Sequence, residues 1–389
     1  MKKSTYLTIL LLIWVNLWNI KPFGGNMTAD YTQIMLLMYL AFGVSIYSNS
    51  TIKLRVNKYK PMKWIFVGIF FSMISAYMYY GQSITQSLIA YRYIYFLASI
   101  ILFFKISFKP RDILKGIHTF SVLLAIMYFI KLSLPQFFYF SPQILEMQEN
   151  GSYTMGMGGF ALVTIPLFMR LQNLRNKFVA KEMYWVLFYL AILFFMQNRS
   201  VLFASLLITA YQILKIKTQY KPAIIILCVG LFVYFGADVI NNLMLETQEQ
   251  LADDEYNRNL ALPYFISATT QDWFTAIFGC GFISAHTSPI MQTLMDAGIY
   301  NSDVGLVGFW NHYGIIPVIA ILYLFISTLR TKEMPLFMKM LALLHLSCVL
   351  TIEYYGNYVS MSRFLFFYYL YFYYMNEIKM KKMRLKLAR

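Results

Sequence analysis

Long apolar segments alternate with short polar ones along almost the whole chain. Most of the apolar segments approach the length of roughly 20 residues that a helix needs to cross a bilayer. The pattern therefore predicts an all-α, polytopic membrane protein with about twelve transmembrane helices. We place these spans at about residues 5–20, 32–48, 64–80, 87–104, 113–131, 157–172, 182–197, 201–214, 222–240, 304–328, 336–352 and 359–376.

We expect a single integral membrane domain over residues 1–389, interrupted by two long polar loops. These are residues 132–156 and, longer still, residues 241–303 between the ninth and tenth spans. Loops of that length are usually functional or disordered. The second loop is rich in aromatic residues, which is not the composition of a disordered segment. Acidic residues at 253–255 suit the start of a helix, and Pro263 could kink it.

Composition agrees with this interpretation, since 59% of the residues are hydrophobic and 13% are charged. A soluble domain would carry about twice that share of charge. The formal net charge of +16 raises the possibility of a nucleic-acid partner. However, the basic residues lie in short clusters between apolar runs, which is a signal of membrane topology, so we expect no nucleic-acid binding.

The distribution of Lys and Arg predicts the orientation of the chain. With the N-terminus in the cytoplasm, 27 of 33 basic residues and only 4 of 17 acidic residues fall on the cytoplasmic side. Lys and Arg are enriched in cytoplasmic loops, so both termini are expected in the cytoplasm. The first span follows Met1-Lys2-Lys3 without a small-residue cleavage site, and we expect it to be retained.

Neither the cysteines nor the acidic residues predict a metal site. Cys228 and Cys348 fall in predicted spans, and Cys280 lies alone in the outer loop. The adjacent acids at 253–255 cannot all face one ion, because neighbouring helix residues point in different directions. We therefore expect no metal and no cofactor.

Four arginines lie in or beyond the predicted bilayer on its outer side: Arg92, Arg199, Arg258 and Arg363. Charge kept there is costly, so each of them is a candidate functional residue. A guanidinium can hold a phosphate through two parallel hydrogen bonds. The four side chains therefore predict a lipid-linked anionic substrate whose diphosphate group they bind.

Each arginine also has a structural interpretation. Arg199 lies in the expected turn 197–200 and could reach lipid phosphates by extending along the membrane surface. Arg258 could pair with the acids one or two helical turns before it. Arg92 and Arg363 could pair with Glu353 or another acid inside the bundle.

A glycosyl transfer needs a base that removes a proton from the accepting hydroxyl group. His286 and Asp303, both in the outer loop, are the catalytic candidates, and Glu255 is a third possible base. Arg258 is a catalytic candidate of another kind, since a cation can stabilise charge on the leaving group.

The other histidines lie in apolar spans. His312 is either a loop-side catalytic group or a buried polar residue satisfied by neighbours such as Asn311. His118 and His345 have no polar companion in their spans, and we expect both to be structural.

Three aromatic residues are candidates for stacking on sugar rings: Trp273, Tyr300 and Trp310. The alternative is that they belong to the aromatic belt that membrane proteins place at the lipid–water interface.

Several short motifs follow one another in the C-terminal half. Asn198-Arg199-Ser200 opens a span, and Phe278-Gly279-Cys280-Gly281 follows in the long outer loop. Residues 302–306 then lead into Tyr313-Gly314-Ile315-Ile316. This series of motifs, over about residues 190–325, resembles the O-antigen polymerase and ligase superfamily, which includes the Wzy-type polysaccharide polymerases. The family typically has Ser-Arg where this chain has Arg-Ser.

This resemblance implies a metal-independent glycosyltransferase that joins oligosaccharide repeat units carried on undecaprenyl diphosphate. Arg199 and Arg258, with Arg92 or Arg363, would then hold the diphosphate, and no cofactor would be needed. The implied partners are the lipid-linked oligosaccharide, membrane lipid, a chain-length regulator and a flippase. The alternatives are an O-antigen ligase, a lipid-linked oligosaccharide flippase, or a structural partner of a secretion complex.

Overall fold

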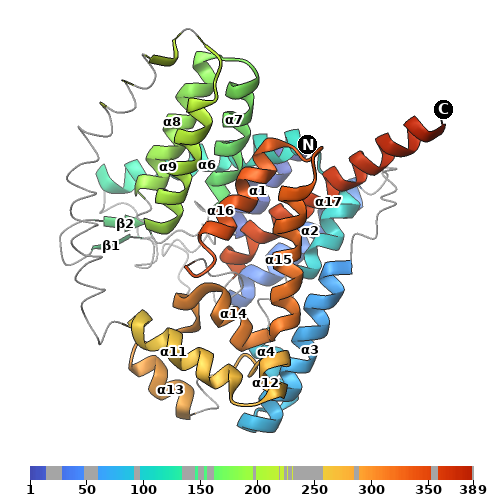
Figure 1. Ribbon diagram of the computed structural model, residues 1–389, viewed down its shortest axis with the longest axis vertical. Helices are drawn as coiled ribbons and strands as arrows, with labels where there is room; N and C mark the ends of the chain where they lie inside the picture. The colour runs from blue at the N-terminus through green and yellow to red at the C-terminus, as the bar shows by residue number, and fades with distance from the viewer. Residues whose placement is uncertain are drawn as a thin grey trace.

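The computed structural model describes residues 1–14, 29–47, 60–91, 97–133, 145–147, 153–155, 162–195, 199–218, 220–222, 226, 230, 257–283, 289–351 and 358–387. Within these ranges the fold is all-helical apart from one small hairpin-like sheet (Figure 1). The sheet pairs β1 (Leu145–Met147) with β2 (Tyr153–Met155) in antiparallel register, and Glu146 faces Thr154. The predicted α class is confirmed.

The helices of the N-terminal half are α1 (Lys3–Trp14), α2 (Ala29–Tyr47), α3 (Lys60–Tyr80), α4 (Ile84–Ala90), α5 (Ile100–Ile106) and α6 (Pro110–Ser133). Those of the middle of the chain are α7 (Thr164–Asn176), α8 (Ala180–Phe195), α9 (Arg199–Leu214), α11 (Asn257–Thr270), α12 (Trp273–Phe278) and α13 (Pro289–Asp296). The C-terminal part has the 3-10 helix η5 (Asn301–Val304), then α14 (Gly305–Tyr313), α15 (Ile315–Arg330), α16 (Leu336–Ser347) and α17 (Tyr358–Leu387).

Close helix contacts depend on small residues at the crossing points. α1 packs on α6 where Gly116 faces Leu7, and a Cβ atom at 116 would lie 2.8 Å from the Leu7 side chain. α3 packs on α15 where Gly68 faces Pro317. Helices approach closely where a residue has no side chain, and this favours dense packing in bundles that bury apolar faces. Both glycines therefore set the spacing of the bundle.

The centre of the bundle is the first half of α17. Every residue from Phe364 to Phe372 is buried, so this segment is enclosed on all sides. A helix that is hydrophobic all round belongs in the core of a large protein or in a membrane. Tyr369 donates a hydrogen bond to the Phe108 carbonyl at 2.8 Å, and Tyr368 accepts one from the Met62 amide at 2.9 Å. These bonds tie α17 to the ends of α5 and α3.

Two of the predicted spans are not continuous helices. The span expected at 304–328 consists of η5, α14 and α15, with a break at Gly314, whose φ is 83°. The described residues of the span expected at 87–104 are the end of α4, which stops at Ala90, a 3-10 turn at 97–99 and the start of α5 at Ile100. Hydropathy records only apolar character and cannot detect a break made by a single backbone conformation.

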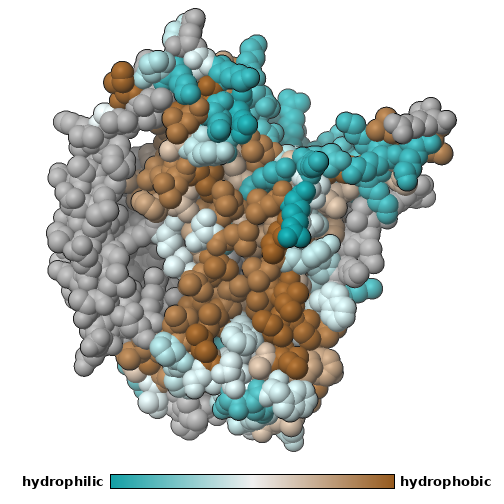
Figure 2. All heavy atoms as spheres, in the orientation of Figure 1, coloured by the Kyte–Doolittle hydropathy of each residue, from teal (hydrophilic) through white to brown (hydrophobic). Residues whose placement is uncertain are grey.

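One described helix, Pro61–Tyr80 within α3, is long and apolar enough to cross a membrane by itself. Seven further apolar helices are shorter, at 10–17 residues. The surface nevertheless has a broad apolar belt across its middle, with hydrophilic residues at the end that carries the N-terminus (Figure 2). Large apolar side chains are exposed on α2, α3, α9 and α15, among them Met38, Phe70, Phe203 and Ile319.

Candidate functional site

A folded cap closes the end of the bundle opposite the N-terminus, and it contains the described part of the long predicted loop (Figure 1). We define the cap as α11, α12, the turn 279–283, α13, η5 and α14. A small apolar cluster holds it together, in which Ala261 and Phe265 of α11 contact Val304 of η5. Pro263 lies inside α11, which runs from Asn257 to Thr270.

The Gly-Cys-Gly turn of the cap packs backbone against backbone on the break between α14 and α15. The Cys280 amide donates to the Asn311 carbonyl at 2.6 Å. A Cβ atom at Gly279 would lie 2.6 Å from the Gly314 nitrogen, and one at Gly281 would lie 2.7 Å from the Ser72 carbonyl oxygen. Both Gly279 and Gly281 have positive φ, at 80° and 94°. The turn therefore requires glycine on both sides of Cys280.

Asn311 is the polar centre of the cap and is 5% exposed. Its amide nitrogen donates to the Thr269 hydroxyl at 2.9 Å and to Cys280 Sγ at 3.4 Å. Its side-chain oxygen accepts a hydrogen bond from Asn301 Nδ2 at 2.7 Å. Burial raises the pKa of the Cys280 thiol to about 11, so this thiol stays neutral at physiological pH.

A second set of hydrogen bonds anchors the cap to α3 and α4. The Phe282 amide donates to the Tyr91 hydroxyl at 2.8 Å, and the Phe282 carbonyl accepts from Gln82 Nε2 at 3.1 Å. The Tyr91 hydroxyl also bonds Ser72 at 2.8 Å. On the outer edge of the cap, Tyr79 donates to the Asp272 carboxylate, which itself caps the first turn of α12. The cap is therefore a fixed layer of the fold.

Three helix ends meet around Cys348, beside the second turn of α17, and we call this place the Cys348 junction. Cys348 ends α16, and its Sγ donates to the Ser200 carbonyl in the first turn of α9 at 3.3 Å. The next residue, Val349, accepts from the Leu306 amide in the first turn of α14 at 2.9 Å. Arg363 of α17 is close enough to interact electrostatically with the Cys348 thiol.

The junction brings together positions of three predicted site residues. Arg199 is the first residue of α9, next to Ser200, and Asp303 lies in η5, two residues before the start of α14. For both of these the structure describes the backbone only. Arg363 is partly buried, and its Nε and Nη1 atoms are buried. It also interacts electrostatically with His345 of α16.

Arg258 lies on the adjoining part of the cap, as the second residue of α11. Its side chain is not described, but Ala261, three residues on, packs on Val304 of η5. The N-terminal ends of α9, α11 and α14 thus lie close to η5 and the Cys348 junction. A helix N-terminus carries partial positive charge, so these ends add to the charge of the arginines.

Several predicted positions lie outside the described residues: Arg92, Glu255, His286 and Glu353. Nothing in the structure bears on their roles or on the alternative pairings suggested for the arginines.

The three aromatic candidates lie in different environments on the cap. Trp273 of α12 is 71% exposed and Tyr300, before η5, is 42% exposed. Trp310 of α14 is partly buried, and its Nε1 donates to the Ala276 carbonyl at 2.7 Å. This bond joins α14 to α12, so Trp310 has a structural contact in addition to any contact with a sugar.

His312 faces aromatic rings on the cap side of the bundle. Its ring centroid lies 4.6 Å from that of Phe282, and no hydrogen bond of its imidazole occurs within the described part of the chain. Asn311, the neighbour suggested as one possible partner of His312, instead bonds Thr269, Cys280 and Asn301. His345 stacks on Phe325, with centroids 5.0 Å apart.

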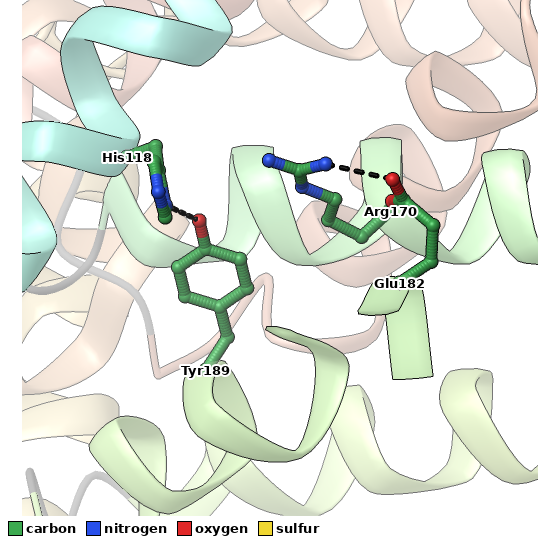
Figure 3. Close-up of polar contacts among 4 residues, drawn as sticks. All are labelled: His118, Arg170, Glu182 and Tyr189. Carbon is green, nitrogen blue, oxygen red and sulfur yellow. Dashed lines mark hydrogen bonds and ion pairs between the residues drawn. The ribbon is translucent and has the colours of Figure 1, made fainter. Parts of the chain in front are cut away.

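A polar cluster that the sequence did not predict joins α6, α7 and α8 (Figure 3). His118 Nδ1 and the Tyr189 hydroxyl lie 2.6 Å apart, and Arg170 Nη1 lies 2.8 Å from Glu182 Oε1. The Arg170 guanidinium is positioned between the Tyr189 hydroxyl and Glu182. His118 therefore has a polar companion after all. The short turn between α7 and α8, which brings positions 170 and 182 together, was the available signal.

Among the described residues, no group of three or more His, Cys, Asp or Glu side chains could hold a metal ion. An apolar groove of about 610 Å³ lies on α3 and α5, and Phe66, Val67 and Phe70 are among the residues that line it. No known protein-family model matches the chain. No curated protein matches it significantly.

Proposed function

We propose that this chain is a bacterial plasma-membrane glycosyltransferase that polymerises oligosaccharide repeat units carried on undecaprenyl diphosphate. Polymerisation takes place on the outer face of the membrane, and the product is a surface polysaccharide such as O-antigen, capsule or exopolysaccharide. Both termini lie in the cytoplasm, and the chain crosses the bilayer about twelve times. The apolar belt of Figure 2 supports the membrane placement, because exposed apolar surface of that extent is unusual in water.

The observation that supports the proposal is that the backbone positions of Arg199 and Arg258 lie at and next to the Cys348 junction, where Arg363 is partly buried. Arg199 is the first residue of α9, Arg258 is the second residue of α11, and Arg363 has buried guanidinium atoms. A cation inside an apolar bundle is costly and usually has a function, and binding of a diphosphate is a function that fits arginine. Arginine also matches phosphate geometry, since it can donate two parallel hydrogen bonds.

The reaction requires charge stabilisation at the leaving group and a base at the acceptor. An acceptor hydroxyl oxygen forms a bond to the anomeric carbon of the donor chain, and the bond from that carbon to the diphosphate oxygen breaks. Undecaprenyl diphosphate leaves with the electron pair, and the arginines stabilise its charge. Asp303, in η5 next to the junction, or His286 takes the hydroxyl proton.

The test is a gel of surface and lipid-linked glycan from cells that carry single variants. Arg199→Ala and Arg363→Ala are expected to collapse the ladder to one repeat unit while the protein level is retained. Loss of one charge-stabilising group typically lowers a rate by about 10² to 10³. Arg363→Lys keeps the charge but not the paired donors, so it should retain part of the ladder.

Arg175→Ala is the matched control, because this arginine on α7 loses only its 2.8 Å hydrogen bond to Gln212. A ladder of normal length in both alanine variants would refute the assignment of Arg199 and Arg363. A ladder that stays on undecaprenyl diphosphate would identify a ligase. Single repeats held on the cytoplasmic face would identify a flippase.

A further inference from the structure

The two halves of α17 differ completely in environment. Residues from Phe364 to Phe372 are enclosed by the bundle, whereas residues from Lys381 to Leu387 are almost all exposed. Both belong to one continuous helix of 30 residues. An isolated helical extension of about ten residues is only marginally stable in water. A surface that supports the second half would therefore stabilise it.

The exposed half carries a dense positive charge: Lys379, Lys381, Lys382, Arg384 and Lys386. The turn between α15 and α16 adds Arg330 and Lys332, both exposed. Glu333 of this turn joins the two parts through an ion pair with Lys382 at 2.8 Å. The hydrogen bond from Lys382 lowers the pKa of the Glu333 carboxyl, so the pair persists at neutral pH. The two segments form one basic surface.

Apolar residues on the same segment form a narrow stripe between the basic ones. Met380, Met383 and Leu387 are spaced by three and four residues, which places them on one face of the helix. Lysines lie on both sides of this face. Leu387 is 88% exposed, and Met380 and Met383 are partly exposed. Helices that lie in a lipid headgroup layer combine such an apolar stripe with basic residues that extend to phosphates.

The direction of the helix fits the same surface. In Figure 1 the end of α17 leaves the bundle obliquely, in contrast to the upright α3 and α15. Figure 2 shows this end as hydrophilic, beside the polar N-terminal end and above the apolar belt. A helix in that position runs along the boundary between the belt and water.

We infer that residues 377–387 of α17, together with the α15–α16 turn, bind anionic phospholipid headgroups at the cytoplasmic face of the membrane. The inference rests on the membrane placement in the proposed function but not on the transfer reaction. Charge complementarity identifies the partner, because each Lys or Arg near an anionic bilayer contributes a change of about fivefold in binding. The apolar stripe favours lipid over an acidic protein surface or nucleic acid, neither of which requires it.

Hydrogen exchange of the full-length chain in lipid nanodiscs tests this inference. Amides of residues 377–387 are expected to exchange at least about tenfold more slowly in discs containing phosphatidylglycerol than in discs of phosphatidylcholine alone. The triple variant Lys379→Gln, Lys382→Gln and Lys386→Gln should lose the difference between the two lipids. A variant with Lys177→Gln and Lys181→Gln, in the basic α7–α8 turn, should keep it.

Equal exchange in the two lipids would overturn the inference. If lipid has no effect but native membranes protect the segment, the partner is an acidic protein and the lipid assignment is wrong. The glycan ladder reports the transfer reaction separately. The triple variant is expected to lose the lipid-dependent difference in hydrogen exchange and to keep a ladder of normal length, because lipid binding and the transfer reaction are separate. An unexpected exchange result contradicts only the lipid inference, and an unexpected ladder in the arginine variants contradicts only the proposed reaction.

Discussion

Arg170 and Glu182 show how single residues keep charge inside an apolar bundle. Their side chains are only 16% and 17% exposed, and the ion pair joins α7 to α8 at 2.8 Å. Each charge compensates the other, and His118 and Tyr189 fill the adjoining space with a hydrogen bond of their own. Removal of one member of such a pair leaves an uncompensated charge in poor solvent, which costs more than removal of both.

We therefore predict strong coupling between these two positions. Arg170→Met and Glu182→Met should each lower the free energy of unfolding by on the order of 2 kcal/mol, and the double variant should lower it by less than the sum. Reversible unfolding in mixed micelles measures all three values. Lys382→Met, in the exposed pair with Glu333, is the control and should cause no measurable change. Additive costs at 170 and 182 would contradict the coupling.

At the scale of elements, the break between α14 and α15 determines how the cap is held. Gly314 adopts a φ of 83°, and a Cβ atom there would overlap the Ile277 carbonyl oxygen and lie 2.5 Å from atoms of Phe278. The end of α12 therefore rests directly on the backbone of the break. Gly279, the residue that follows α12, also lies against the Gly314 backbone. The break between α14 and α15 is therefore also the place where the end of α12 contacts the bundle.

Substitution of these glycines separates backbone strain from close packing. Gly314→Ala and Gly81→Ala both place a side chain at positive φ, which costs about 1 kcal/mol. A Cβ atom at Gly81 would meet nothing within 4 Å, so that variant should show only this strain. Gly314→Ala should cost about 1–3 kcal/mol more, because the cap must shift. Equal melting temperatures of the two variants would show that the close contact of Gly314 with the end of α12 does not contribute to stability.

At the scale of the whole molecule, an apolar belt lies between a hydrophilic end and a cap that is closed by hydrogen bonds. If the belt lies in a membrane, the α7–α8 turn and the cap are on opposite sides of it. Exposed positions exist on both, at Lys177 in the turn and at Gln271 between α11 and α12. The buried cysteines Cys280 and Cys348 contribute little background to a labelling experiment at these sites.

Labelling of introduced cysteines tests this topology. Gln271→Cys should react with a membrane-impermeant thiol reagent in intact cells, and Lys177→Cys should react only after the membrane is opened. The unsubstituted chain gives the background, including any signal from Cys228. Reaction of both positions from outside would contradict the twelve-span arrangement.

The sequence predicted the helical class and most helix positions, because a helix is the structure in which a long apolar run satisfies its own backbone hydrogen bonds. α3 and α6 begin and end within a few residues of the expected spans. It did not predict the break at Gly314, which depends on contact with α12, a segment 36 residues earlier. The same holds for the Cys348 junction, which brings together residues from helices distant in the chain, so no local pattern encodes their proximity. In the cluster around Arg170, the short turn between α7 and α8 indicates that Arg170 lies near Glu182, whereas the contact of His118 on α6 with Tyr189 on α8 has no such local signal.

The contact between Gly279 and Gly314 also limits how the chain can change over evolutionary time. The two backbones lie so close that a side chain at either position must displace the other segment. A sequence that loses one glycine can recover only through a compensating shift of the other loop. Among related sequences, substitutions at positions 279 and 314 should therefore occur together, whereas the exposed residues around them should vary independently of each other.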